Sequence, residues 1–418
     1  MEEKRLIFHV DVNSAYLSWT AMDMLQKGAK EDLRKFPSVV GGDPKTRHGI
    51  VLAKSIPAKK YNIQTGESIY SALQKCPSLV IVPGSYELYG KCSNAMIDIL
   101  KEYTPAVQRY SVDECFLDFS NMENCYADSI ELANTIRERI KNELGFTVNI
   151  GVSSNKLLAK VASDLKKPDR VHTLFPEEIK DKMWRLPIEN LFMVGRATLP
   201  KLKRLNINTI GDLANYDEDK LRYFLKSHGT LIWNYANGIE DSAVRYDTHI
   251  PMKGIGNSTT IPFDVEDRYT AYKVLLSLCE TVASRLRNSE NGCQVIAISI
   301  RNSSLISYSK QKKIVTPTNI TKDIFAICCK LFDELWKGDP IRHLGVSVTE
   351  LSSISQIQLS IFDEKNYEKK LAIDMTIDSI RKKYGPKAIV KSTFLHSGIK
   401  ALSGGVGEED YPVMSSIL

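Results

Sequence analysis

The sequence lacks the long apolar runs that are typical of membrane proteins. No stretch approaches the ~18 consecutive apolar residues that a membrane-spanning helix needs. The first apolar run, within MEEKRLIFHVDV, is short and is interrupted by His9 and Asp11, so it does not resemble a signal peptide. We therefore expect a cytoplasmic protein that makes no membrane contact.

Cysteine patterns that organise a fold are also missing. The eight cysteines form no CxxC pair and show no spacing typical of a metal site. In the absence of an export signal we expect reduced thiols that are buried as small apolar side chains.

The sequence has no strong excess of one charge. Lys and Arg together number 56 against 50 for Asp and Glu, a net charge of +6, which permits a nucleic-acid partner without requiring one. With 43% hydrophobic and 25% charged residues, the composition excludes disorder, collagen-like repeats and a coiled-coil rod as the main state. At roughly 100–200 residues per domain, 418 residues predict two to four domains.

The periodicity of apolar residues changes along the chain. Strand-like patterns at 6–12, 109–119 and 147–152 alternate with helix-like patterns up to about residue 170, which indicates a mixed α/β or α+β region. One of the helical patterns is followed by Gly145, a candidate C-cap. Short helical patterns follow over 176–238, and a polar stretch at 239–253 is a linker candidate. Strands return over 254–351, before a tail with one clear helical pattern that ends at Gly385.

Three acids lie in or beside apolar strand patterns, where they are costly unless they are paired or bind a metal. Asp11 lies in LIFHVDV, whereas Asp113 and Glu114 lie within RYSVDECFLDF. Because neighbouring residues of a strand point to opposite faces, the chain must turn or bulge near 111–114 for both acids to reach one site. Carboxylates are suitable ligands for Mg²⁺ in phosphoryl transfer. From spacing alone, acids that cap turns or lie at solvated edges are the favoured interpretation.

The segment at 40–44, VGGDP, invites a second interpretation. It is similar to the GGDEF loop of nucleotidyl cyclases, but Pro44 replaces the acid and the following aromatic residue is missing. We interpret it as a plain turn.

Three longer motifs are far more specific together than any single one. HVDVNSAYLSW (9–19), YSVDECFLDFS (110–120) and GVSSNKLLAKVASDLKKP (151–168) resemble the palm motifs of Y-family translesion DNA polymerases, in the same order and at the same separations. The similarity is strongest to the UmuC-like branch (ImpB/MucB/SamB), of bacterial, phage or plasmid type, and covers about residues 5–355.

The resemblance implies an α+β multidomain fold, the right-hand polymerase with palm, fingers, helical thumb and little finger. Its implied parts are a palm at 1–14 and 83–173, fingers at 15–82, a thumb at 174–238, a linker at 239–253, a little finger at 254–351 and a tail at 352–418 that carries a clamp-binding peptide and one helix.

The resemblance also implies roles in catalysis. Asp11 and Asp113 would hold two Mg²⁺ ions, together with the backbone carbonyl of Val12, and Glu114 would complete the site. Tyr16 matches the steric gate that excludes a ribose 2′-hydroxyl, although without its motif it would be interpreted as a core aromatic residue.

Two lysines correspond to nucleotide contacts of the family. Lys160 matches a lysine on the triphosphate, and its alternative is a solvated helix residue. Many members carry Tyr-x-x-Arg in the fingers, whereas this chain has Ile56 and Lys59 at the two positions. Ile56 cannot bind phosphate and Lys59 cannot form the bidentate contact of arginine, although the UmuC-like branch also carries lysine there.

The DNA-holding parts are implied by weaker similarities. Residues 191–213 resemble a helix–hairpin–helix, in which Gly195 fits the second glycine and Met193 replaces the first. An ordinary helical hairpin is the alternative. The basic residues that would face DNA are Lys201, Lys203 and Arg204 in the thumb and Lys310, Lys312 and Lys313 in the little finger.

A short peptide in the tail resembles the sliding-clamp-binding pentapeptide of bacteria. Its apolar side chains would fill a pocket on the clamp while its glutamine binds at the edge. The peptide consists of Gln358, Leu359, Ser360, Ile361 and Phe362.

Taken with these motifs, the resemblance implies a template-directed, low-fidelity DNA polymerase that acts in translesion synthesis and DNA repair. The expected partners are primer–template DNA, dNTP and the sliding clamp, with a monomeric chain and possible accessory subunits. One alternative is a non-catalytic, polymerase-like protein that binds DNA and the clamp. Another is a palm-type nucleotidyl cyclase, which does not need to bind duplex DNA.

Overall fold

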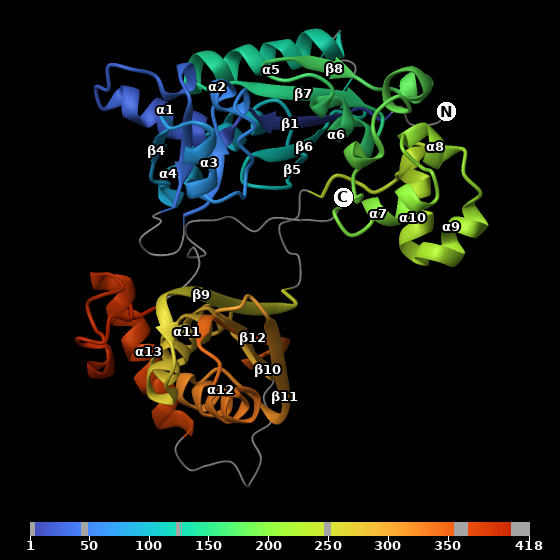
Figure 1. The fold of residues 1–418 in the computed structure, drawn as a ribbon. Coiled ribbons are helices and arrows are strands. Elements are labelled where there is room, and N and C mark those ends of the chain that lie inside the picture. Colours follow the sequence, from blue (N-terminus) through green and yellow to red (C-terminus); the bar gives the residue numbers. More distant parts are fainter. Residues whose placement is uncertain are drawn as a thin grey trace. The chain divides into compact units, whose positions relative to one another are not determined.

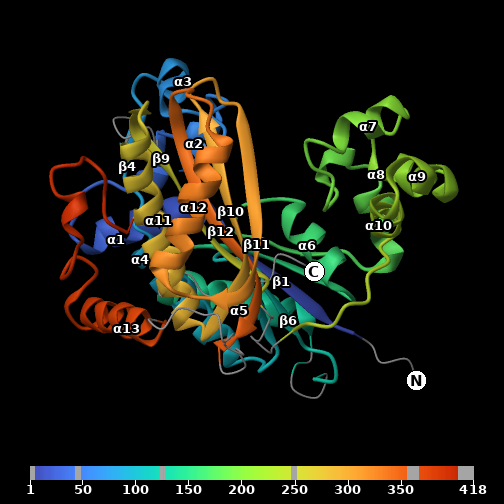
Figure 2. The ribbon, with the colours of Figure 1, turned by 90° about the horizontal axis from the view of Figure 1, so that it is seen from below.

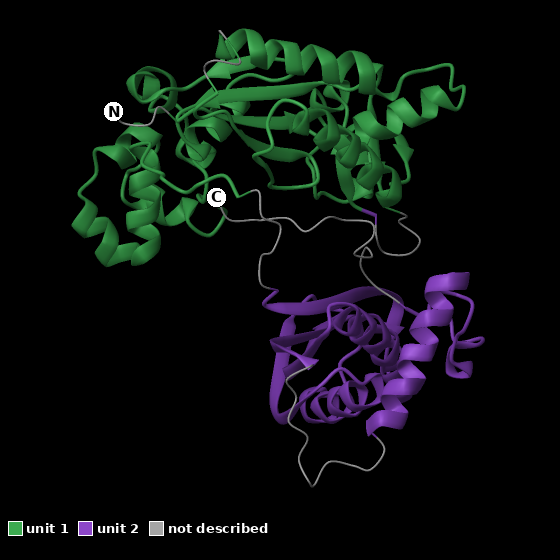
Figure 3. Ribbon diagram, turned by 180° about the vertical axis from the view of Figure 1, so that it is seen from behind, with its two compact units in different colours: residues 1–42, 50–250, 409–418 green, residues 43–49, 251–408 purple. Residues whose placement is uncertain are grey.

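The computed structural model describes residues 5–42, 49–122, 126, 128–245, 252–354 and 367–402. The chain divides into two compact units, one made mostly of residues 1–250 and the other mostly of residues 251–408 (Figure 3). Within these ranges no helix has the length and apolar character needed to cross a membrane.

The first unit is built on a five-stranded sheet with the order β5-β6-β1-β7-β8 (Figure 1). The central strand β1 (Ile7–Val12) is antiparallel to both β6 (Glu114–Asp118) and β7 (Val148–Ser153). The edge strands are β5 (Val107–Arg109) and β8 (Val171–Thr173). The strands predicted at 6–12 and 147–152 are therefore confirmed.

The strand region predicted at 109–119 contains a tight turn. The amides of Tyr110 and Ser111 both donate to the carbonyl of Glu114, at 2.9 and 3.0 Å. This hairpin joins β5 to β6 and supplies the turn that the two neighbouring acids require.

Helices cover both faces of this sheet. On one face, the apolar core formed by Phe8, Val10 and Leu117 packs against α4 (Tyr86–Lys101) and α5 (Ser129–Leu144). Helix α5 ends at Gly145, whose φ of 73° confirms the predicted C-cap.

The other face of the sheet carries α6 (Lys156–Asp164). A Cβ atom on Gly151 of β7 would lie 1.9 Å from the carbonyl oxygen of Ala159, so only glycine allows the helix to come this close.

A three-stranded sheet, β3-β2-β4, forms the part expected to be the fingers. Helix α1 (Ala15–Gln26) precedes it, and Ser14 at its N-terminus has a φ of 50° and forms no side-chain cap. Asp43 and Pro44 of the VGGDP segment lie outside the described residues. The elements of this part are β2 (Ser38–Gly41), β3 (Val51–Lys54), β4 (Val80–Val82), α2 (Ile56–Lys59), α3 (Ile69–Lys75) and the short helix η1 (Leu33–Lys35).

Short helices follow, as the sequence predicted for 176–238. They surround their own apolar core, to which Leu202, Ile210 and Leu221 belong. The helices are η3 (Pro176–Glu178), η4 (Ile179–Met183), η5 (Ile188–Asn190), α7 (Leu199–Arg204), α8 (Ile210–Ala214), α9 (Glu218–Leu225) and α10 (Ser227–Ala236).

The stretch expected to be a linker from residue 239 is attached to the first unit up to residue 245. Lys156 is fully buried and donates from Nζ to the carbonyl of Ala243 at 3.0 Å, and burial lowers the pKa of this lysine to about 8. Arg5 donates to the carbonyl of Ser242 at 2.7 Å. A buried ammonium requires polar partners, so the segment follows the sheet although its own sequence is polar.

The second unit is a four-stranded antiparallel sheet with the order β11-β10-β12-β9, covered on one face by α11 and α12. Its strands are β9 (Gly254–Val265), β10 (Asn291–Asn302), β11 (Ser307–Thr318) and β12 (Ile341–Ser353). Its helices are α11 (Arg268–Asn288), α12 (Thr321–Leu335), α13 (Tyr367–Tyr384) and the short η7 (Ser392–Phe394).

The predicted tail helix is α13, which lies beside α11 (Figure 2). Arg287 of α11 pairs with Asp374 at 3.1 Å and with Asp378 at 2.7 Å, and Glu280 pairs with Arg381 at 3.2 Å. The two helices are therefore antiparallel. The apolar periodicity of the tail gave no sign of these ion pairs.

The cysteines in the described ranges are free, and all are buried except the half-buried Cys329.

Candidate active site

Asp11 and Glu114 are direct partners across the β1–β6 ladder. Directly opposite residues of antiparallel strands point to the same face, so both carboxylates lie on the face that α6 covers. The turn before β6 brings Asp113 to the same end of the sheet, where its carbonyl accepts a hydrogen bond from the amide of Val12 at 3.0 Å. The structure thus brings together the backbone positions of all three predicted acids.

The side chain of Asp113 is hydrogen-bonded within its own turn. Its Oδ1 accepts a hydrogen bond from the hydroxyl of Ser111 at 2.6 Å. In the described part of the chain, no group of three or more His, Cys, Asp or Glu side chains converges on one point. Asp11 and Glu114 therefore form a pair, and the side chain of Asp113 is bonded to Ser111.

A lysine neutralises each carboxylate of the pair. Lys160 Nζ lies 2.8 Å from both oxygens of Glu114, and Lys167 Nζ lies 3.0 Å from Asp11 Oδ2. Lys167 also lies 2.8 Å from Asp164, which is mostly exposed. Both lysines come from the third motif, one from α6 and one from the segment directly after it.

The local electrostatics favour a cation. Burial is the largest cause that raises the pKa of Asp11, to about 8, with Lys167 acting against the shift and the charge of Glu114 adding to it. Burial likewise raises the pKa of Asp113, against a hydrogen bond from Ser111 that lowers it. Buried carboxylates in this arrangement are hard oxygen donors in need of positive charge, so the residues fit a divalent cation in their chemistry.

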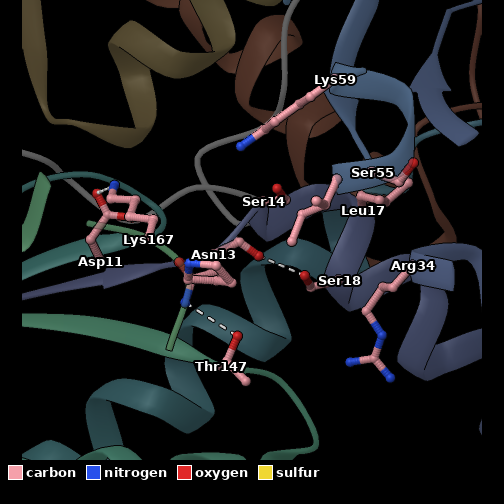
Figure 4. A pocket seen from close by; sticks show the side chains of 12 residues that line it. Asp11, Asn13, Ser14, Leu17, Ser18, Arg34, Ser55, Lys59, Thr147 and Lys167 are labelled. Atoms are coloured by element: carbon pink, nitrogen blue, oxygen red, sulfur yellow. Dashed lines mark hydrogen bonds and ion pairs between the residues drawn. The ribbon is translucent and has the colours of Figure 1, made fainter. Parts of the chain in front are cut away.

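Directly beside this pair lies a cavity of about 380 Å³ (Figure 4). Asp11 and Lys167 form one end, and Lys59 and Arg34 come from the part expected to be the fingers. The full lining is Asp11, Asn13, Ser14, Leu17, Ser18, Arg34, Ser55, Ile56, Lys59, Thr147, Lys167 and Pro168. The cavity therefore has an acid with its paired lysine at one end and Lys59 and Arg34 on the side expected to be the fingers, an arrangement that suits an anionic nucleotide with a bound cation.

The two lysines predicted to bind the nucleotide lie in different surroundings. Lys59 lines the cavity, whereas Lys160 does not and is paired with Glu114 instead. Lys167 was missed by the sequence reasoning, and the only signal for it was its place at the end of the third motif. Tyr16 stacks on Tyr89 with ring centroids 4.5 Å apart, at an angle of 22°.

The predicted helical hairpin is present around Met193 and Gly195. The amides of Thr198 and Leu199 both donate to the carbonyl of Gly195 at 3.0 Å. Met193 has a φ of 70°, a conformation that favours glycine, so it occupies the first glycine position with backbone strain. In α7 the buried Leu202 lies between the exposed residues Lys201 and Lys203, with Arg204 also exposed.

The three basic residues of β11 do not form one cluster. Lys310 and Lys312 are opposite Ile298 and Ile296, on the helix-covered side of the sheet, and Lys310 pairs with Glu334 at 2.8 Å. Lys313 points to the uncovered side, where it pairs with Glu350 at 2.5 Å. The strand's period of two separates them, which the run of lysines in the sequence concealed. The clamp-binding peptide at 358–362 lies outside the described residues.

Comparisons with known proteins agree with this geometry. The sequence model of the impB/mucB/samB family matches residues 10–164, and the model of that family's C-terminal domain matches residues 252–361. DNA polymerase IV of Clostridium acetobutylicum is 50% identical over 392 residues, which cover 94% of this chain and 98% of that protein. DNA polymerase IV 2 of Bacillus subtilis is 34% identical over 402 residues, with coverages of 94% and 96%.

A solved Y-family DNA polymerase chimera of Dbh and Dpo4 shares the fold. It has a TM-score of 0.70 and 22% identity, and the match covers 83% of this chain and 99% of the chimera. The expected right-hand polymerase fold is therefore confirmed. With acids at the ends of two inner strands of the sheet, lysines around the cavity and relatives matched over nearly their full length, the chain belongs to the impB/mucB/samB family of Y-family DNA polymerases.

Proposed function

We propose that this chain is a template-directed DNA polymerase that carries out low-fidelity, translesion DNA synthesis with primer–template DNA and deoxynucleotides as substrates. The observation that carries the proposal is the pairing of Asp11 with Glu114 across β1 and β6, beside a cavity lined by Lys59 and Lys167. The relatives' shared name supports the same activity.

Within this activity, the acids hold divalent metal ions. We propose two Mg²⁺ ions, with Asp11, Asp113, Glu114 and the carbonyl of Val12 as ligands. Bound there, the ions would activate the primer 3′-hydroxyl and neutralise the charge that develops on the α-phosphate. The protein's own contribution is to hold Asp11 and Glu114 on one face of a rigid sheet, and to release Asp113 from Ser111.

The cavity lysines bind the triphosphate. Lys59 and Lys167 supply point charges from opposite walls, and Ile56 contributes apolar contact without any phosphate bond. The triphosphate contact that the resemblance implied for Lys160 stays a prediction, because Lys160 reaches Glu114 in this structure. Tyr16 acts as the steric gate beneath the sugar.

DNA is held by charge without base recognition. The hairpin turn at Gly195 is flanked by the exposed side chains of Lys201, Lys203 and Arg204. The turn and these basic side chains contact phosphates of the DNA backbone. Lys313 contacts the backbone from the uncovered side of the second sheet. Lys310 and Lys312 contribute from the edge of that sheet. All catalytic residues come from residues 5–245 of one chain, so we propose a monomer.

Primer extension with a single nucleotide tests the assignment of the acids. Glu114→Gln should abolish extension while leaving the binding of primer–template DNA intact in a band-shift assay. The matched control is Glu143→Gln, since Glu143 is half-exposed on α5 and pairs with Arg139. If the wild type and both variants bind but none extends, the non-catalytic alternative replaces this proposal.

We also propose that residues Gln358 to Phe362 bind a sliding clamp. Phe362→Ala should leave extension of short primers unchanged and remove stimulation by the clamp on long primed templates. Ser360→Ala is the control within the same peptide, because its side chain is not one of the apolar anchors. Equal stimulation of both variants would contradict the clamp assignment.

A further inference from the structure

His9 is a buried imidazole on the same sheet face as the catalytic acids. It precedes Asp11 by two residues in β1, so both side chains point to the face covered by α6. The residue is fully buried, and its ring packs against Phe116 with centroids 4.7 Å apart.

The tautomer of His9 follows from its hydrogen bonds. Ser163 Oγ donates its single proton to the carbonyl of Lys160 at 2.7 Å. The contact of 2.8 Å between His9 Nδ1 and Ser163 Oγ must therefore have the imidazole nitrogen as donor. In a neutral ring this leaves Nε2 without a proton, as an acceptor.

That acceptor has no hydrogen-bond partner among the described residues. Nε2 lies 3.9 Å from Glu114 Oε2, the oxygen to which Lys160 donates at 2.8 Å. A buried acceptor without a donor is costly, and the ammonium of Lys160 already donates to the neighbouring oxygen, Glu114 Oε2. Because the two acceptor atoms are 3.9 Å apart, rotation at the end of the lysine side chain is the movement that would exchange one for the other.

Lys160 also has a reason to leave Glu114. A divalent cation that binds Glu114 competes with the ammonium for the same two oxygens. Lys167 faces the same competition at Asp11, but it is in the cavity and has Asp164 as a second partner. Lys160 does not line the cavity, and its side chain is 13% exposed, so in this structure the second partner within its surroundings is an acceptor inside the protein.

We propose that Lys160 and His9 are positioning residues, in which Lys160 passes its hydrogen bond from Glu114 to His9 Nε2 when a divalent cation binds Glu114. The inference rests on the proposed role of Glu114 as a metal ligand. It gives His9 a function in metal affinity, and it lets the positive charge stay beside the site without blocking it.

The binding of Mn²⁺ to the full chain, measured by electron paramagnetic resonance without nucleotide or DNA, tests this exchange. His9→Asn keeps a donor toward Ser163 and removes the Nε2 acceptor, so Mn²⁺ affinity should fall about 10-fold. His9→Gln keeps an acceptor at the Nε2 position and should bind close to the wild type. In a Lys160→Met background, His9→Asn should have no further effect.

Three outcomes overturn the inference: an unchanged affinity in His9→Asn, an equal loss in His9→Gln, or a loss that persists in the Lys160→Met background. Asp11→Asn distinguishes this failure from failure of the proposed metal site. If Asp11→Asn weakens Mn²⁺ binding and His9→Asn does not, only the exchange is wrong. If neither does, the metal site itself is wrong.

A measurement on the wild type avoids variants that fail to fold. With ¹⁵N-labelled histidine, the unprotonated ring nitrogen of His9 should shift when Mg²⁺ is added, because it gains a hydrogen bond. An unchanged resonance at saturating Mg²⁺ contradicts the proposal.

Discussion

The ammonium of Lys167 lies 3.0 Å from Oδ2 of Asp11, so the chain's own lysine supplies the positive charge beside this acid. Under the proposed function, a nucleotide that enters with its cation would supply both a new partner for Asp11 and a phosphate for Lys167, so the two could separate without leaving a buried charge unpaired.

Replacing Lys167 should affect nucleotide binding more than chemistry. Lys167→Ala removes a charge-assisted contact worth roughly 1.5–3 kcal/mol, so KM for dNTP should rise about 10- to 100-fold in steady-state primer extension. Lys166→Ala is the control, because Lys166 is the neighbour of Lys167 in the chain and its exposed side chain does not line the cavity. Equal KM values for the two variants would contradict the phosphate contact.

The ring of Tyr16 should control sugar selection. Tyr16→Ala opens space beneath the sugar, so incorporation of ribonucleotides should rise relative to deoxynucleotides in competition assays. Tyr16→Phe retains the ring that stacks on Tyr89 and should keep the wild-type ratio. If Tyr16→Ala leaves the ratio unchanged, Tyr16 is only part of the aromatic core.

Asp11 should make stability dependent on pH in the absence of metal. Its pKa in the folded state, about 8, is above its ordinary value of 3.8, so folding favours the protonated acid. This contribution is complete below about pH 4 and is lost as the pH rises through about 8. Asp11→Asn has no carboxyl to ionise, so its folded state does not lose stability in this way as the pH rises. In EDTA, its melting temperature should exceed that of the wild type by more at pH 9 than at pH 5. A constant difference would contradict a raised pKa.

Arg287 should be needed to keep α13 on the second unit. Its side chain is 8% exposed and is paired with two aspartates of α13. Arg287→Met leaves both acids without their cation and should cost about 3 kcal/mol in urea-induced unfolding. Arg268→Met is the control, since Arg268 is 60% exposed in its pair with Asp333 and should contribute less than about 1 kcal/mol. Similar losses in both variants would show that the ion pairs do not attach the helix.

Features that depend on neighbouring residues were predictable from the sequence. The strand at 6–12 follows from an unbroken apolar run, and the end of α5 at Gly145 follows from a residue that tolerates positive φ. The turn before Glu114 was required by the geometry of a strand. The family itself followed from three motifs in order, because those motifs preserve residue types at fixed spacing.

Only the tertiary structure decided which charges meet. Asp11 and Glu114 are more than 100 residues apart, and one step in strand register would have turned them to opposite faces. The same holds for Lys160 with Glu114, for Lys156 with Ala243, and for Arg287 with α13. The pattern of residue types within a short segment reflects how readily that segment forms a helix or a strand. The free energy of pairing two charges depends on distance and burial, which arise only when distant segments pack together.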